Sequence, residues 1–199
     1  MTGDPMGKSN PNVRYAEIDR ESSHSRVHLV LGLDGGSRCD AATGIAQFDG
    51  LLRDLARYAA FDLGVTVESD GPIDASHMAE DVGTAMGKAL RGAVELSDEV
   101  VGIAHAVVPN GDALVLAAVD LRSRPFLAFE APFSRESVAD LATEAVQEFF
   151  QAMSLYSGAS LHVRALSGRN DAHLAEACFR AAGRALAGST RLSGRANGC

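Results

Sequence analysis

Two short motifs in this chain of 199 residues place a carboxylate three positions after an imidazole. His77 precedes Glu80, and His173 precedes Glu176. Side chains three residues apart share one face of a helix, so each pair would work together on a helical segment. Histidine and carboxylate ligands together suit Mn, Fe, Zn or Ni, whereas Mg and Ca prefer oxygen ligands alone. The motifs therefore predict catalytic and metal-binding roles for these four residues.

A third imidazole, His162, lies shortly before the second motif in a segment with the alternating pattern of a strand. This alternation places His162 on the opposite face from Leu161 and Val163. A single histidine–glutamate pair is more often part of a solvated helix face, and that alternative stays open. The predicted metal ligands are His77, Glu80, His162, His173 and Glu176.

The two motifs belong to a longer internal repeat. When the chain is aligned with itself at an offset of 96 residues, residues 74–90 fall on residues 170–186. The two histidine–glutamate motifs then coincide, and Lys88 aligns with Arg184. A fixed offset of this kind indicates an internal duplication. We therefore expect two structurally equivalent halves, each carrying one motif.

Each half shows the periodicities of a strand, a helix, a second strand and a second helix. In the first half these elements are predicted at residues 26–33, 51–59, 63–67 and 74–90. In the second half they are predicted at residues 113–121, 137–155, 160–165 and 171–187. Ser134 or Ser137 is the expected N-cap of the helix at 137–155. The expected fold class is α+β, with tandem duplicated β-α-β-α half-domains whose sheets are covered by helices on one face.

Composition limits the classes of function that the chain can have. Hydrophobic residues make up 46% of the chain and charged residues 22%, as in ordinary globular proteins. A formal net charge of −8 offers no basic face for nucleic acid. No apolar run approaches the roughly 20 residues that span a bilayer, and three cysteines are too few for a disulfide framework. We expect a cytoplasmic protein that binds a small-molecule substrate and neither nucleic acid nor membrane.

Both ends of the chain differ from its middle. Residues 1–12 and 188–199 are rich in Gly, Ser and Asn and lack a periodic pattern, which predicts a disordered tail at the start and a flexible one at the end. Residues 13–187 are expected to form a single domain. This domain consists of a first repeat at 13–95 and a second repeat at 96–187.

Several segments make the chain similar to the imidazoleglycerol-phosphate dehydratase family. They read TGIAQFD at 43–49, IDASHMAEDVGTAMGKAL at 73–90, DALVLAAVDLRSRP at 112–125 and GRNDAHLAEACFRA at 168–181. The resemblance implies a lyase of histidine biosynthesis that removes water from imidazoleglycerol phosphate. It also implies a duplicated α+β subunit that forms trimers and then a homo-oligomeric shell of 24 subunits, with two Mn ions per site held by histidines and glutamates at subunit contacts.

The chain departs from the family pattern at the implied metal ligands. The family motif reads HHxxE in both halves, whereas here Ser76 and Ala172 stand in place of the leading histidines. Gly50 and Tyr58 stand where the family has two further histidines. Losing ligands in the inner coordination sphere should reduce metal affinity strongly, because even outer-sphere losses cost about 10–100-fold. We therefore expect one transition metal per site at most, rather than a two-metal cluster.

The resemblance also implies substrate-binding residues. Arg124 matches a phosphate-binding arginine of the family, and Arg180 stands where the family has a lysine that faces phosphate. His24 and His105 align with a glutamate and an arginine that contact substrate. Arg124 as a turn residue and Arg180 as a solvated helix residue are the open alternatives.

These observations lead to one expected function and two alternatives. The expected function is that of a diverged, repurposed lyase acting by elimination, dehydration or proton transfer on a small azole-like or phosphorylated substrate. The first alternative is the family's own dehydration in histidine biosynthesis. The second is a non-catalytic homologue that forms a shell or binds a small molecule.

Overall fold

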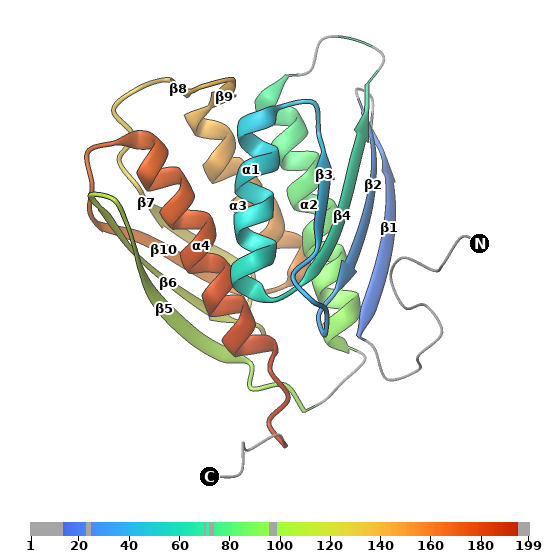
Figure 1. Ribbon diagram of the computed structural model, residues 1–199. Coiled ribbons are helices and arrows are strands. Elements are labelled where there is room, and N and C mark those ends of the chain that lie inside the picture. Colours follow the sequence, from blue (N-terminus) through green and yellow to red (C-terminus); the bar gives the residue numbers. More distant parts are fainter. Residues whose placement is uncertain (1–13, 23–24, 70, 72–73, 96–98, 195–199) are drawn as a thin grey trace.

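Two four-stranded sheets enclose four helices in the computed structural model of the chain (Figure 1). The structure describes residues 14–22, 25–69, 71, 74–95 and 99–194. The predicted tail at residues 1–12 lies outside the described residues, as do residues 195–199 of the tail predicted at 188–199. No helix in the described ranges is both long and apolar enough to cross a bilayer.

The first half folds into strands β1, β2, β3 and β4 and helices α1 and α2. The sheet order is β1-β2-β4-β3, and only the β3–β4 pair is parallel. The inward residues of β2, Val27, Leu29 and Leu31, are fully buried, as the predicted alternation requires. The bounds are β1 Tyr15–Glu21, β2 Arg26–Gly32, β3 Cys39–Ala42, α1 Ala46–Ala59, β4 Asp62–Glu68 and α2 Ala75–Glu95.

The second half repeats this arrangement with the sheet order β5-β6-β10-β7. A small two-stranded hairpin, β8–β9, is inserted before its first helix. The bounds are β5 Ile103–Asn110, β6 Ala113–Asp120, β7 Phe126–Glu130, β8 Ser137–Val138, β9 Leu141–Ala142, α3 Thr143–Ser157, β10 Ser160–Ser167 and α4 Asp171–Thr190. The duplication predicted from the sequence is thus present as two equivalent halves.

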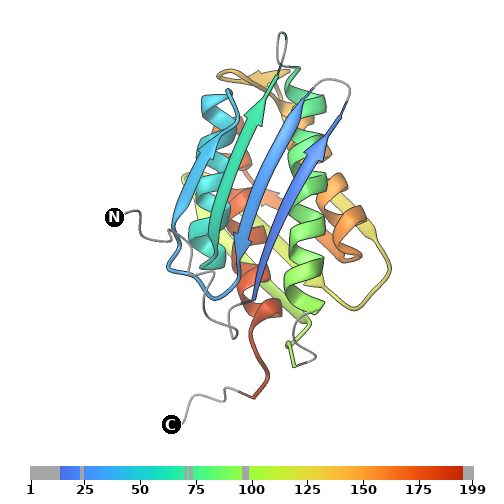
Figure 2. The same ribbon diagram turned by 90° about the vertical axis from the view of Figure 1, so that its right-hand side faces the viewer.

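The helices form two inner layers between the sheets. Helices α1 and α2 cover the first sheet, and α3 and α4 cover the second (Figures 1 and 2). Across the middle, α2 packs on α3 and α4 packs on α1, so each half contacts the other through both of its helices. Phenylalanines fill this junction, with ring centroids 4.8 to 6.2 Å apart among Phe48, Phe149, Phe150 and Phe179. The prediction that helices cover one face of each sheet is confirmed.

Two equivalent glycines allow the helices to approach closely. A Cβ atom added to Gly87 of α2 would lie 2.6 Å from the carbonyl oxygen of Met153 in α3. A Cβ atom added to Gly183 of α4 would lie 2.6 Å from the carbonyl oxygen of Leu55 in α1. These glycines align with each other in the internal repeat, so both halves use the same packing contact.

Several predicted boundaries are wrong, most clearly for the helix predicted at 137–155. Helix α3 begins at Thr143, and neither Ser134 nor Ser137 caps it, since its N-cap is Ala142. Residues 137–142 form the β8–β9 hairpin instead. The carboxylate of Asp140 in this hairpin accepts hydrogen bonds from the backbone N–H groups of Ala46 and Gln47 at the start of α1. Local propensity could not reveal this contact, because its partners are more than 90 residues apart.

Other elements extend beyond their predicted ends. Helix α2 continues to Glu95 rather than 90, and α4 continues to Thr190 rather than 187. Ser189 and Thr190 are buried, and both hydroxyls donate to the carbonyl oxygen of Leu186. The prediction of a flexible tail from residue 188 is therefore wrong for the last residues of α4. Strands β1, β3, β5 and β7 are absent from the predicted elements, because their inward residues are mostly only partly buried, which leaves a weak hydrophobic pattern.

Candidate functional site

The first predicted pair, His77 and Glu80, lies at the start of α2. Met78 and Ala79 between them are buried, which leaves the two motif side chains exposed on the outer side of the helix. The carboxylate of Asp74 accepts a hydrogen bond from the backbone N–H of His77 at 3.0 Å. The same oxygen lies 3.2 Å from the Nδ1 atom of His77. One aspartate thus caps the helix and fixes one edge of the imidazole.

The second pair, His173 and Glu176, lies at the equivalent place in α4. Asn170 caps this helix by accepting hydrogen bonds from the backbone N–H groups of Ala172 and His173. The Nδ1 atom of His173 lies 2.8 Å from a carboxylate oxygen of Asp112, in the turn between β5 and β6. The hydrogen bond from His173, with that from the N–H of Arg169, lowers the pKa of Asp112 to about 2. Both motif histidines therefore have a carboxylate on Nδ1.

Arg180 is engaged by protein groups. Its Nε atom lies 2.7 Å from Asp54 of α1, and its two terminal nitrogens bond to Asn110 and to Glu176. Burial lowers the pKa of this guanidinium, but the carboxylates of Asp54 and Glu176 raise it by more. The pKa of Arg180 is therefore above its ordinary value, and the side chain stays charged. Its side chain is only 21% exposed, which contradicts the alternative of a solvated helix residue. The predicted phosphate contact would compete with these partners and stays a prediction.

His162 and His105 lie in one row on the outer face of the second sheet. Ala118 of β6 pairs with His105 of β5 on one side and with His162 of β10 on the other. Both histidines are exposed, and the ring of His162 lies 5.6 Å from that of Phe126. Since α3 and α4 cover the opposite face of this sheet, the sheet separates His162 from the motif pair of α4.

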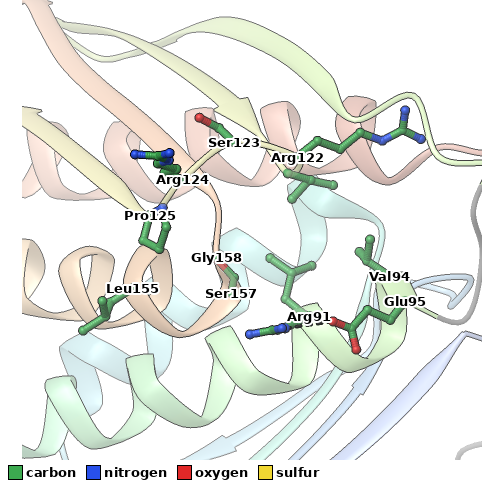
Figure 3. A pocket seen from close by; sticks show the side chains of 12 residues that line it. Arg91, Val94, Glu95, Arg122, Ser123, Arg124, Pro125, Leu155, Ser157 and Gly158 are labelled. Carbon is green, nitrogen blue, oxygen red and sulfur yellow. Dashed lines mark hydrogen bonds and ion pairs between the residues drawn. The ribbon is translucent and has the colours of Figure 1, made fainter.

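Arg124 lies in a pocket of about 390 Å³ at the other end of α2 (Figure 3). The pocket also contains Arg91 and Glu95 of α2 and Arg122 of the loop after β6. Its cationic groups suit an anion such as a phosphate. Arg91 and His77 are 14 residues apart on α2, which corresponds to about 21 Å along the helix axis. Within one chain, the pocket and the first motif pair are therefore far apart.

The five predicted metal ligands do not meet in one chain. Within the part of the chain that the structure describes, no three His, Cys, Asp or Glu side chains are grouped so that they could hold a metal ion. Each motif supplies one histidine and one glutamate, a donor type that fits a transition metal, but two donors are too few for a complete site. His24 lies outside the described residues, so its predicted role cannot be placed.

Two aspartates and a cysteine next to the motif residues have structural roles. Asp81 accepts hydrogen bonds from Arg20, Ser22 and Ser25. Asp171 accepts them from the backbone of Ser134 and Arg135. The thiol of Cys178 is buried in the core, and burial raises its pKa to about 12. These three groups are therefore structural, and the thiol stays protonated.

Sequence analysis missed the residues that hold the second motif. His173 is bonded to Asp112, and Glu176 is bonded to Asn110. Arg180 is bonded to Asp54 of α1. The dipeptide Asn110–Gly111 marks a turn in the sequence and could have indicated a hairpin. Its contact with a helix more than 60 residues away follows only from the tertiary structure.

Comparisons with known sequences give one consistent result. A model of the imidazoleglycerol-phosphate dehydratase family matches residues 43–186. The imidazoleglycerol-phosphate dehydratase of Acidiphilium cryptum is 43% identical over 185 residues, covering 93% of this chain and 94% of that protein. The enzyme of that name from Acetivibrio thermocellus is 38% identical over 185 residues, covering 93% of this chain and 95% of that protein.

Solved structures agree with the sequence comparisons. The crystal structure of imidazoleglycerol-phosphate dehydratase from Staphylococcus aureus matches with a TM-score of 0.80 at 26% identity, covering 89% of this chain and 99% of that chain. The structure of the Pyrococcus furiosus protein matches with a TM-score of 0.78 at 26% identity, covering 91% and 97%. The similarity thus extends over both halves of the fold.

Proposed function

Because the chain belongs to the imidazoleglycerol-phosphate dehydratase family, we propose that it removes water from imidazoleglycerol phosphate, as a lyase of histidine biosynthesis. The expectation of a diverged and repurposed member is not borne out. Relatives that carry the dehydratase name are 36% to 43% identical over nearly the whole chain. This similarity favours the first alternative, the family's own reaction, over a new one.

The observation that carries the proposal is the repeated arrangement at the starts of α2 and α4. Both halves keep a histidine and a glutamate three residues apart, and in both an aspartate bonds the Nδ1 edge of the histidine. Metal-binding and acid–base histidines commonly have such a carboxylate partner. A solvated helix face would not require the same pairing in both halves.

Elimination of water needs a base that takes a proton from carbon and an acid that protonates the departing hydroxyl. Glu80 and Glu176 are the proposed proton carriers, and the Nε2 atoms of His77 and His173 are the groups that meet the azole end of the substrate. Arg124 would hold the phosphate as a charged hydrogen-bond donor. A transition metal, when bound, would supply Lewis acidity and a template for these groups. We retain the prediction of one such ion per site.

We infer that a complete site combines residues of several copies of the chain. Arg91, in the Arg124 pocket, lies about 21 Å along the axis of α2 from His77, and imidazoleglycerol phosphate is much shorter than this separation. Each motif pair also supplies only two metal donors. A homo-oligomer, built from trimers as the family resemblance implies, would bring the groups together. This assembly, and the cytoplasmic location, stay predictions.

The test is direct turnover of imidazoleglycerol phosphate by the purified full chain, with and without added Mn²⁺. We expect a product lighter by one water, detected by mass spectrometry. Glu176→Gln should lower kcat by about 10²–10⁴-fold, because it removes a proton carrier. Glu130→Gln is the matched control, since Glu130 forms an exposed ion pair with Arg164 away from both motifs.

A folded chain that leaves imidazoleglycerol phosphate unchanged, in the presence of Mn²⁺ and at its native oligomeric state, would contradict the proposal. Metal content then separates the remaining functions. A bound transition metal without turnover favours a different lyase reaction, whereas neither metal nor turnover favours the non-catalytic alternative.

A further inference from the structure

The tip of the β5–β6 hairpin contacts the start of α4 through three consecutive residues, Asn110, Gly111 and Asp112. Asn110 donates hydrogen bonds to the carbonyl oxygen of His173 at 3.1 Å and to Glu176 at 3.0 Å. Asp112 lies 2.8 Å from the Nδ1 atom of His173. Both residues of the second motif are therefore held by one turn that is distant in the sequence.

The carboxylate of Asp112 is itself fixed in place. Its second oxygen accepts hydrogen bonds from the backbone N–H of Arg169 at 2.7 Å and from that of Asn170 at 3.2 Å. These N–H groups belong to the segment that leads into α4. One oxygen thus anchors the carboxylate to the backbone, and the other is left to bond the imidazole of His173.

Gly111 lets the imidazole lie directly against the turn. It has a φ of +56°, which favours glycine, and an added Cβ atom would lie only 2.4 Å from the Nδ1 atom of His173. A side chain at this position would therefore displace the ring. Two contacts therefore fix the position of the His173 ring: the carboxylate of Asp112 at Nδ1 and the backbone of Gly111 against the ring.

The hydrogen bond to Asp112 decides which ring nitrogen of His173 carries the proton. An ionised carboxylate can only accept a hydrogen bond, so the Nδ1 atom of His173 must carry the proton that it shares with Asp112. The lone pair of the neutral ring is then on Nε2. That is the form an imidazole needs in order to bind a metal ion or to accept a proton through Nε2.

We propose that Asp112 is a positioning residue that holds His173 in the Nδ1–H form, with its Nε2 lone pair available to metal or substrate. This inference rests on the proposed function for the role of His173, but its own geometry is independent of the reaction. His77 has an aspartate at the same edge of its ring, Asp74 at 3.2 Å, but this residue belongs to the start of α2 itself and not to a hairpin. The competing hypothesis is that the contact only stabilises the packing of the β5–β6 hairpin on α4. In that case the tautomer of His173 would have no role.

The tautomer can be measured without metal or substrate. The assembled full chain, labelled with ¹⁵N-histidine, is studied by magic-angle-spinning NMR at about pH 8.5, well above the ordinary pKa of an imidazole. The signal of His173 is assigned by its loss in His173→Gln. We expect Nδ1–H in the wild type, a loss of this form in Asp112→Ala, and its partial return in Asp112→Glu.

Asp19→Ala is the matched control. Asp19 lies 2.8 Å from the Nδ1 atom of His28 on the outer face of the first sheet, so the variant breaks a pair of the same kind away from both motifs. It should change the signal of His28 and leave His173 unaltered. Wild-type His173 in the Nε2–H form, or an Nδ1–H form that survives in Asp112→Ala, would overturn the proposal.

Equilibrium dialysis against Mn²⁺ supplies a second readout. Asp112→Ala should weaken binding about 10–100-fold, as other losses of a carboxylate behind a histidine ligand do, whereas Asp19→Ala should bind as the wild type does. Equal binding by Asp112→Ala and wild type contradicts the positioning role toward metal. If the wild type binds no Mn²⁺ yet the tautomer follows Asp112, the proposed metal fails while the positioning of His173 is supported.

Discussion

Two neighbouring carboxylates at the first motif, Glu80 and Asp81, have different roles, although nothing in the sequence distinguishes them. Glu80 is exposed, whereas its neighbour Asp81 is buried. Asp81 accepts two hydrogen bonds from Arg20 on one oxygen and bonds from Ser22 and Ser25 on the other. Burial raises the pKa of Asp81, but the hydrogen bonds from the serines and Arg20 lower it below its ordinary value. Asp81 thus ties the β1–β2 turn to α2.

Asp81→Asn should destabilise the fold by about 2 kcal/mol near neutral pH, because hydrogen bonds to a charged group are lost in a buried place. A lowered pKa in the folded state adds stability above the unfolded pKa, which is about 3.9, and this stability is lost as pH falls through the folded pKa. The difference between variant and wild type should therefore shrink below about pH 4. Urea unfolding at about pH 7 and about pH 3 measures it.

Glu21→Gln serves as the comparison for Asp81→Asn. Glu21 forms an ion pair with Arg26 in which both side chains are mostly exposed. Such pairs contribute about 0–1 kcal/mol, so little change is expected at any pH. Equal stability of Asp81→Asn and wild type near neutral pH would show that the network does not stabilise the fold.

The two helices that carry the motifs each approach a neighbouring helix closely at a glycine. Gly87 brings α2 against α3, and Gly183 brings α4 against α1. Both contacts join one half of the chain to the other. The positions of the two motif pairs relative to the sheets therefore depend on these two glycines.

Gly183→Ala should destabilise the protein by about 1–3 kcal/mol, since its Cβ atom would meet the backbone oxygen of Leu55 and force the helices apart. Gly50→Ala on α1 is the matched substitution, because no heavy atom lies within 4 Å of its added Cβ. It should raise stability by about 0.5–1 kcal/mol through helix propensity alone. Opposite signs in urea unfolding are expected. Two stabilised variants would mean that α4 can move away from α1 at little cost.

At the scale of the whole molecule, one chain separates several of the groups that the proposed site combines. The motif pairs lie at the starts of α2 and α4, His105 and His162 lie on the outer face of the second sheet, and the arginine pocket lies at the far end of α2. Contacts between copies are the proposed means by which groups so far apart reach one substrate. The proposed assembly is therefore a requirement of the proposed site.

Mixed assemblies test this requirement. Arg124→Ala and Glu80→Gln should each abolish most turnover when expressed alone. If a site takes its arginine from one copy and its glutamate from another, some sites in a mixed oligomer are intact, and co-expression should restore measurable turnover of imidazoleglycerol phosphate. No recovery in oligomers shown by mass spectrometry to contain both variants would place the site within a single chain.

Much of the architecture could be predicted from the sequence. The offset of 96 residues between the motifs indicated two equivalent halves, and the period of Val27, Leu29 and Leu31 indicated a strand with one buried face. Both signals lie within short segments or recur along the chain, so they can be recognised without knowledge of tertiary contacts. The helix start predicted at Ser137 is wrong, because residues 137–142 form a hairpin whose Asp140 accepts a hydrogen bond from the backbone of α1. Edge strands such as β3 alternate only between partly buried and exposed residues, so their hydrophobic pattern in the sequence is weak.

The sequence alone determined which residue types are available for chemistry and that they occur twice, because a duplicated pattern of side chains does not depend on folding. Only the tertiary structure decided that Asp112 bonds His173, that Arg180 is engaged by Asp54 and Glu176, and that His162 lies across a sheet from α4. These relations arise where elements far apart in the chain pack together. Sequence periodicity describes each element by itself and carries no information about its distant partners.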